Sequence, residues 1–215
     1  NDYFYIKNLL DVSQIIDINN AIEQTNNRDP LSRHKLSLLY QKKSDFKKSI
    51  DVLKQDRDNI NDNIYLAFAY IDGLLGQGEI EEAISTINNL INIKPLNKTL
   101  PLKLAEIYVD HKKGTINVIE SIKTHGDFFR LNPNYHRIMS KLYMDINKKY
   151  ESSIHLAEYY VLMDNAKLAM DVLENSSKSS QITNSDSQKL ITKKIEILCK
   201  HSRPLEPIFG EKTCN

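Results

Sequence analysis

A short apolar pattern recurs five times along the chain: a large apolar residue, a small residue, two variable positions and a tyrosine. The copies are Leu36-Ser37-x-x-Tyr40, Leu66-Ala67-x-x-Tyr70, Leu104-Ala105-x-x-Tyr108, Met139-Ser140-x-x-Tyr143 and Leu156-Ala157-x-x-Tyr160. Positions i, i+1 and i+4 lie on one stripe of an α-helix. Each copy therefore predicts a helix that packs on a neighbour through its small residue.

A second small residue follows two of the copies at the same distance. Ser49 comes twelve positions after Ser37, and Ala169 comes twelve after Ala157. Leu53 and Leu173 follow four residues later, on the same helix face. This spacing predicts helical hairpins in which two small residues meet where the helices cross.

The copies have the period of a known repeat. Leu36 and Leu104 are 68 residues apart, twice the 34-residue period of the tetratricopeptide repeat, whose pattern of large, small and aromatic positions these copies resemble. No segment alternates with the period of a strand. We expect an all-α fold, a tetratricopeptide-repeat superhelix of about twelve helices.

Two irregularities interrupt the regular alternation. Ala67 reaches its partner Ala83 after sixteen residues, which predicts one extra helical turn of about four residues before a turn at 76–78. The tyrosines of the last two copies are only 17 residues apart, half a repeat.

Apolar periodicity together with glycine and proline positions sets the expected helices and domains. The expected helices are 2–13, 14–26, 31–43, 45–56, 62–75, 79–93, 98–112, 115–130, 134–148, 150–163, 165–175 and 184–201. We divide the chain into an opening helical pair at 1–27 that links to a preceding domain, repeats at 28–176, and a capping helix with tail at 177–215. The first helix is expected to carry Tyr3, Ile6, Leu9 and Leu10 on one face, and the apolar face of the cap is expected to contain Leu190, Ile191, Ile195 and Leu198.

The charge and hydropathy of the chain limit the classes of partner that it is expected to bind. The 215 residues carry 29 basic and 28 acidic side chains, a net charge of +1, which argues against binding nucleic acid through bulk charge. No apolar run approaches the roughly 20 residues of a membrane span. Protein or peptide partners are therefore expected.

Motifs for catalysis are missing from the sequence. It contains no glycine-rich phosphate loop, no Gly-x-Ser-x-Gly and no His-Glu-x-x-His, and its six histidines form no i, i+3 or i, i+4 pair. Cys199 and Cys214 are too few for a zinc module, and they are compatible either with a disulfide or with two thiols. We expect neither enzymatic activity nor a cofactor or metal in this chain.

The first three copies predict a binding groove. In tetratricopeptide arrays the residue after the small one lines the concave face, together with residues one turn before it and three positions after it. These positions are Ile64 and the eight predicted groove residues His34, Leu38, Gln41, Phe68, Ile71, Leu102, Glu106 and Val109. They lack the Lys/Asn set that clamps a terminal carboxylate. The alternative is that Leu38, Phe68 and Ile71 belong to the core.

The C-terminal part resembles a protease family. The segment from His155 to Leu162, followed by Ala169–Leu173 and then a helix ending at Lys200-His201-Ser202-Arg203-Pro204, is similar to the end of bacterial periplasmic zinc metalloproteases that carry a C-terminal tetratricopeptide domain, the family of the beta-barrel assembly-enhancing protease. The opening residues 3–10 resemble its linker between protease and repeats. Asp164-Asn165 departs from the family, where a glycine turn is common.

The resemblance implies a periplasmic interaction domain concerned with outer-membrane protein assembly and quality control. Its implied partners are an N-terminal metalloprotease domain, which holds the zinc, and the outer-membrane barrel-assembly machinery or its substrates. Two other hypotheses stay open: a stand-alone tetratricopeptide adaptor or secretion chaperone, and an enzyme in its own right, which needs a cluster of polar groups that the sequence does not indicate.

Overall fold

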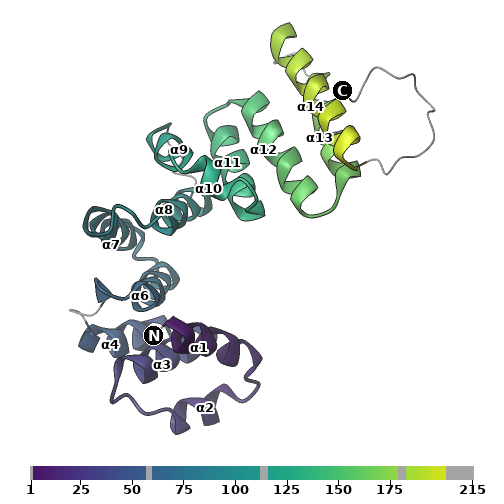
Figure 1. Ribbon diagram of the computed structural model, residues 1–215. Helices are drawn as coiled ribbons and strands as arrows, with labels where there is room; N and C mark the ends of the chain where they lie inside the picture. The colour runs from purple at the N-terminus through teal and green to yellow at the C-terminus, as the bar shows by residue number, and fades with distance from the viewer. Residues whose placement is uncertain (1, 57–59, 112–115, 179–182, 202–215) are drawn as a thin grey trace. The chain divides into compact units, whose positions relative to one another are not determined.

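The chain is all-helical in the computed structural model, which describes residues 2–56, 60–111, 116–178 and 183–201 (Figure 1). Helix takes up 81% of it, and the described residues form 13 α-helices and no strand. The helices are α1 Asp2–Gln14, α2 Ile18–Gln24, α3 Pro30–Lys42, α4 Phe46–Leu53, α6 Ile64–Gln77, α7 Ile80–Ile93, α8 Thr99–Asp110, α9 Ile116–Lys123, α10 Gly126–Phe129, α11 Pro133–Asp145, α12 Lys149–Leu162, α13 Ala166–Ser177 and α14 Asn184–His201, with a 3₁₀ turn η1 at Lys54–Asp56. The all-α prediction is confirmed.

The chain separates into two compact units, Asn1–Leu100 and Pro101–Asn215. The first contains helices α1 to α7, and the second contains nearly all of α8 and the helices after it. Within each unit helices next to each other in sequence pack together: α3 on α4 and α6 on α7 in the first, and α11, α12, α13 and α14 in succession in the second.

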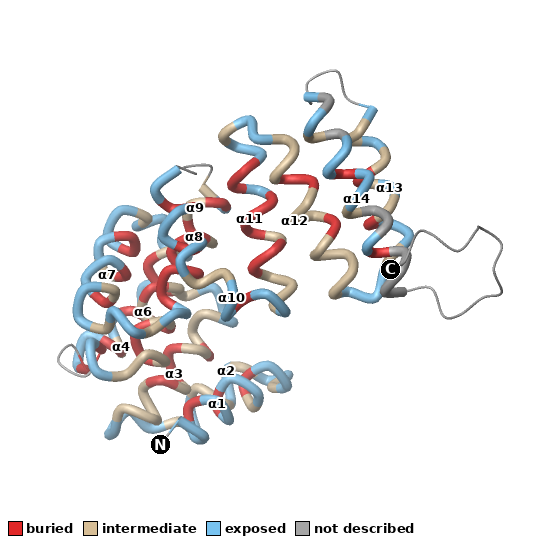
Figure 2. Tube along the Cα trace, turned by 45° about the horizontal axis from the view of Figure 1, so that its top comes forward, coloured by how far each residue is buried: buried red, intermediate tan, exposed pale blue. Residues whose placement is uncertain are grey.

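Every copy of the recurring pattern lies in a helix with its small residue buried. Ser37, Ala67, Ala105 and Ala157 are fully buried and Ser140 is 6% exposed. Figure 2 shows the same trend, with buried positions in bands along the helices. Burial of a small side chain lets a second helix approach the backbone closely.

The predicted partner residues are also in place. The Ser37 and Ser49 hydroxyl oxygens are 2.7 Å apart between α3 and α4. The structure adds a pair with the same twelve-residue spacing that was not predicted, Ser140 and Ser152, whose hydroxyl oxygens are 3.2 Å apart between α11 and α12. Ala157 and Ala169 are both fully buried. Helix α12 thus presents Ser152 to the helix before it and belongs to the next hairpin through Ala157, which explains the half-repeat step.

Four hairpins share one kind of turn. Gly78 (φ 83°) and the non-glycine residues Ser44 (φ 62°), Asn147 (φ 63°) and Asp164 (φ 57°) are left-handed and end the first helix of each pair. The next residue donates its N–H back to the carbonyl of the pattern's tyrosine: Asp45 to Tyr40, Lys148 to Tyr143 and Asn165 to Tyr160, each at 2.8 Å. This closure is the Schellman motif. Asp164 therefore takes the left-handed conformation that glycine usually provides at such a turn.

The second hairpin has the predicted extra turn. The matching bond runs from Glu79 N to Leu74 O, four residues beyond Tyr70, at 2.9 Å. The turn itself begins later than expected, because Gly76 and Gln77 are helical and Gly78 alone is left-handed. Gly76 serves packing instead: a Cβ there would lie 2.2 Å from the Phe46 ring of α4.

One predicted helix is divided. The range 115–130 contains α9 and the short α10, separated at Thr124-His125. The break lets Phe129, 3% exposed, stack on Tyr135 of α11 at a ring distance of 5.6 Å. Both belong to a cluster that joins α8, α9, α10 and α11.

The last helix packs on α13 and α12. Leu190 is fully buried in a cluster with Ala157, Ala169 and Leu173, whereas Ile191 is 50% exposed. The side chains of Ile195, Leu198 and Cys199, and the whole of Cys214, lie outside the described residues, so the expected cap face is described only in part and the cysteine alternatives stay open.

Candidate functional site

The eight predicted groove residues divide into two groups by burial. His34, Ile71, Leu102 and Val109 are at most 8% exposed. Leu38, Gln41, Phe68 and Glu106 are half-buried. The first five in sequence belong to the first unit and the last three to the second. The burial of Ile71 fits the alternative of a core position, and the half-buried four retain some surface.

Gln41 holds helices together. Its side-chain N–H group donates to the Ala69 carbonyl of α6 at 2.6 Å and to the Ser49 hydroxyl of α4 at 3.0 Å. These bonds satisfy a polar group between three helices. Its amide nitrogen is therefore already engaged within the protein.

His34 and Glu106 are engaged as well. The His34 ring is 1% exposed, lies 3.4 Å from the Asn8 amide nitrogen, and meets the Tyr5 ring edge-on. Burial lowers the pKa of His34 to about 4, so the ring is neutral near pH 7. Glu106 accepts a hydrogen bond from the Asn134 amide.

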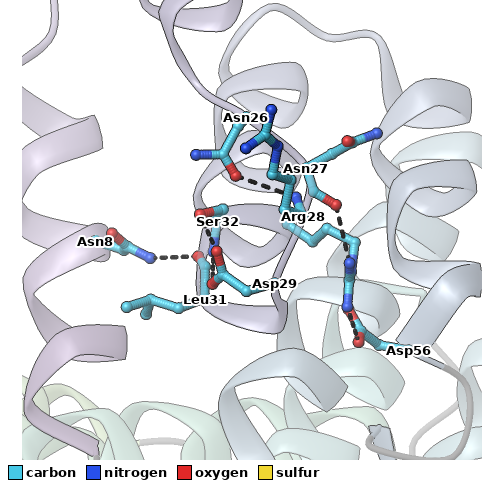
Figure 3. A network of polar contacts seen from close by, with 9 residues as sticks. Asn8, Asn26, Asn27, Arg28, Asp29, Leu31, Ser32 and Asp56 are labelled. Atoms are coloured by element: carbon cyan, nitrogen blue, oxygen red, sulfur yellow. Dashed lines mark hydrogen bonds and ion pairs between the residues drawn. The ribbon is translucent and has the colours of Figure 1, made fainter.

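A polar network ties the first unit together around the start of α3 (Figure 3). Asp29 caps α3 by accepting from Ser32, and Asn8 of α1 donates to the Leu31 carbonyl at 2.9 Å. Arg33 forms two 2.6 Å bonds with the buried carboxylate of Asp56. The polar groups of this network form hydrogen bonds with one another, and the bond from Asn8 to Leu31 fixes the position of α1 on α3.

Helix α1 has a second apolar face that points to solvent. Tyr5 and Val12 pack inward, whereas Tyr3, Ile6, Leu9 and Leu10 are between 44% and 64% exposed. These four are the residues that the sequence places on one face. An apolar helical stripe left open to water is typical of an interaction surface.

A groove follows helices α12 and α14 in the second unit. One hollow, of about 410 Å³, lies at the ends of these helices and is lined by Arg130, Leu131, His136, Glu158, Val161, Leu162, Lys193, Glu196 and Ile197. A second, of about 290 Å³, lies nearer their starts and is lined by Tyr150, Ile154, Lys189, Thr192, Lys193 and Glu196. We call the first the corner pocket, because Arg130 and Leu131 come from the corner between α10 and α11.

An ion-pair network joins the two hollows. Lys193 of α14 pairs with Glu158 of α12 and, at 3.1 Å, with Glu196 of its own helix. Burial lowers the pKa of Lys193 and the two carboxylates raise it, and the net effect is a raised pKa. The ammonium group is therefore charged and holds α12 against α14.

One histidine, His136, lines the corner pocket, and a second, His155, contacts it. The Nε2 atom of His136 lies 3.0 Å from the Arg130 carbonyl, and its Nδ1 lies 3.1 Å from Nδ1 of His155. Because a carbonyl only accepts, His136 donates through Nε2 and its Nδ1 accepts from His155. Burial, followed by the neighbouring His136 and Lys123, lowers the pKa of His155 to about 4, and burial also lowers the pKa of His136.

The positional rule used for the first three copies also finds this groove. Applied to Leu156-Ala157-x-x-Tyr160, it gives Ile154, Glu158 and Val161, and these three line the two hollows. The fifth copy of the pattern therefore carries the sequence signal for this groove. Arg130 and Leu131 had no such signal, because the α10–α11 corner places them.

The fold and these surfaces define an all-α protein whose helices pack in neighbouring pairs and leave an apolar groove and an apolar helix face open. No protein-family model and no curated protein matches the sequence. Among the described residues, no group of three or more His, Cys, Asp or Glu is arranged to hold a metal ion. No helix in the described ranges has the length and apolar character needed to cross a bilayer.

Proposed function

We propose that this chain is a non-catalytic, tetratricopeptide-type protein-interaction domain. The observation that carries the proposal is the five-fold pattern with its small residues buried and, in three hairpins, the same turn closed on its tyrosine. Repeats of this kind present extended grooves to partner proteins. The groove along α12 and α14 is the surface that suits a partner segment best.

We further propose that the domain belongs to a periplasmic zinc metalloprotease concerned with outer-membrane protein assembly and quality control. The motivation is the resemblance of the segment from Leu156 to Leu173 and of the opening residues to that family. In this proposal α1 packs on the metalloprotease domain through Tyr3, Ile6, Leu9 and Leu10, and the groove receives the assembly machinery or its substrates. Zinc is held by the protease domain.

The coding sequence upstream of Asn1 tests the protease half of the proposal. We expect a His-Glu-x-x-His motif there, since it supplies two zinc ligands and the general base of such enzymes. A start codon close to Asn1 and a stable partner complex without a protease would instead support the stand-alone adaptor or chaperone.

Association with the separately expressed metalloprotease domain tests the α1 face. Ile6→Glu combined with Leu10→Glu places two charges in the proposed apolar interface. The double variant should weaken association at least about tenfold, because each substitution removes an apolar side chain that the interface would bury. Ile16→Glu is the matched control, since Ile16 is 97% exposed and outside α1. Equal binding of all three proteins by titration calorimetry would exclude the α1 face as the interface.

A further inference from the structure

The interior of the corner pocket offers a ligand mainly apolar surface. Leu131, Val161, Leu162 and Ile197 contribute it, and Leu131 is 72% exposed although it is a large apolar side chain. His136 adds no free polar atom, because both of its ring nitrogens have partners at 3.0 and 3.1 Å. An apolar side chain therefore enters this pocket without breaking a hydrogen bond.

Three of the four charged side chains of the pocket are engaged with one another. Lys193 contacts both Glu158 and Glu196, and the side chains of Lys193 and Glu158 are only 20% and 26% exposed. Arg130 is exposed, and its guanidinium makes no hydrogen bond or ion pair with any described residue. A ligand carboxylate would give this guanidinium a partner, and a guanidinium suits a carboxylate through two parallel N–H bonds.

The groove continues beyond the pocket. The second hollow shares Lys193 and Glu196 with the first and follows the same two helices toward Tyr150 and Ile154. A chain bound in the corner pocket therefore has a path onward along α12 and α14. This favours an internal segment of a partner over a chain end.

We propose that the corner pocket binds an internal segment of a partner protein in which a large apolar side chain stands next to an aspartate or glutamate. The apolar side chain lies against Leu131, Val161 and Leu162, and the carboxylate pairs with Arg130. This inference rests on the proposed protein-binding function and specifies the chemistry of its partner.

Short fluorescent peptides test the inference by anisotropy. Each is acetylated and amidated, so that it has no terminal charge, and carries a phenylalanine followed by glutamate, or by glutamine in the matched peptide. We expect the glutamate peptide to bind about tenfold more tightly, the effect of one charge-assisted hydrogen-bonding pair. Arg130→Gln should remove this difference and leave the affinity of the glutamine peptide unchanged.

Two further variants control for unspecific effects. Arg28→Gln removes another exposed arginine, in the first unit, and should leave the preference for glutamate intact. Leu131→Ser should weaken both peptides, and because Leu131 is largely exposed it should leave the helical circular dichroism spectrum unchanged.

Three results would overturn the inference. They are a preference for glutamate that survives Arg130→Gln, equal affinities of the two peptides for the unmodified protein, and tighter binding of a neutral peptide once its C-terminal amide is replaced by a free carboxylate. The last result would make the occupant a chain end. If no tested peptide binds but the protein still captures a purified partner along α12 and α14, the inference fails and the proposed function stands; failure of both measurements contradicts both.

Discussion

At the residue scale, the hairpin turns show how one backbone conformation is met by different side chains. The left-handed position is occupied by Gly78 in one turn and by Ser44, Asn147 and Asp164 in three others. Left-handed backbone costs a residue with a Cβ atom roughly 1–2 kcal/mol, and least when it is Asn or Asp. Ser44 therefore holds strain that the turn's two backbone bonds, from Ser44 to Gln41 and from Asp45 to Tyr40, both 2.8 Å, offset.

Ser44→Gly should stabilise the protein by about 1 kcal/mol, because glycine adopts this conformation without steric cost. The midpoint of urea unfolding, followed by circular dichroism, measures the change. Gly78→Ala is the reciprocal control and should cost a similar amount, since a Cβ at Gly78 has no atom within 4 Å and meets only backbone strain. An unchanged midpoint for Ser44→Gly would mean that its strain is relieved elsewhere.

At the scale of elements, glycines decide how closely α4 approaches α6. A Cβ at Gly73 would lie 2.9 Å from Ile50 Cγ1, and one at Gly76 would lie 2.2 Å from the Phe46 ring. Phe46 and Ile50 are four residues apart on α4, and Gly73 and Gly76 are three apart on α6, so two facing stripes meet. The sequence predicts a turn at 76–78, but only Gly78 has the left-handed backbone of the turn. Gly76 lies inside α6, where its missing side chain leaves room for the Phe46 ring of α4.

Gly76→Ala should destabilise the protein by about 1–3 kcal/mol, the usual cost of inserting a carbon into a packed contact. Guanidinium unfolding measures it, and a double-mutant cycle with Phe46→Leu should recover part of the loss, because the smaller side chain relieves the contact. Gly126→Ala is the comparison: its Cβ would meet the Tyr135 hydroxyl at 3.2 Å, so a smaller effect is expected. Stabilisation by Gly76→Ala, as helix propensity alone would give, would contradict the packing role.

At the scale of the whole molecule, each unit contains a neutral histidine with a lowered pKa, buried His34 in the first and half-buried His155 in the second. His34 lies in the first unit and His155 in the second, and each has its pKa lowered from 6.5 to about 4, chiefly by burial. A folded pKa below the unfolded value means that the unfolded chain binds more protons below pH 6.5. The contribution of these two histidines to stability should therefore be constant above that pH and be lost as the pH drops toward 4.

The expected slope is about 1.4 kcal/mol per pH unit for each fully buried histidine, and less for the half-buried His155. Urea unfolding between pH 7 and 4.5 measures it. His34→Phe removes one titrating group, so the change of unfolding free energy with pH should lose the contribution of His34. Asn8 keeps its bond to the Leu31 carbonyl in this variant. Identical slopes for the two proteins would show that His34 does not titrate in this range.

Much of the architecture was accessible to sequence reasoning because helical packing is periodic. The small residues Ser37, Ala67 and Ala157 predicted where helices cross, and the sixteen-residue step from Ala67 to Ala83 predicted the extra turn that the Glu79–Leu74 bond displays. The division of 115–130 into α9 and α10 was not predicted, because it depends on the stacking of Phe129 on Tyr135 of another helix.

The sequence by itself determined where most of the helices lie, which small side chains face a neighbour, and that α1 carries an apolar face of Tyr3, Ile6, Leu9 and Leu10. These properties follow from local periodicity. The tertiary structure alone decided that Gln41 bonds to the Ala69 carbonyl, that His136 meets His155, and that Arg130 and Leu131 close a pocket with α14. Such contacts join residues that no repeat period relates, because they depend on where whole helices lie when their cores are packed.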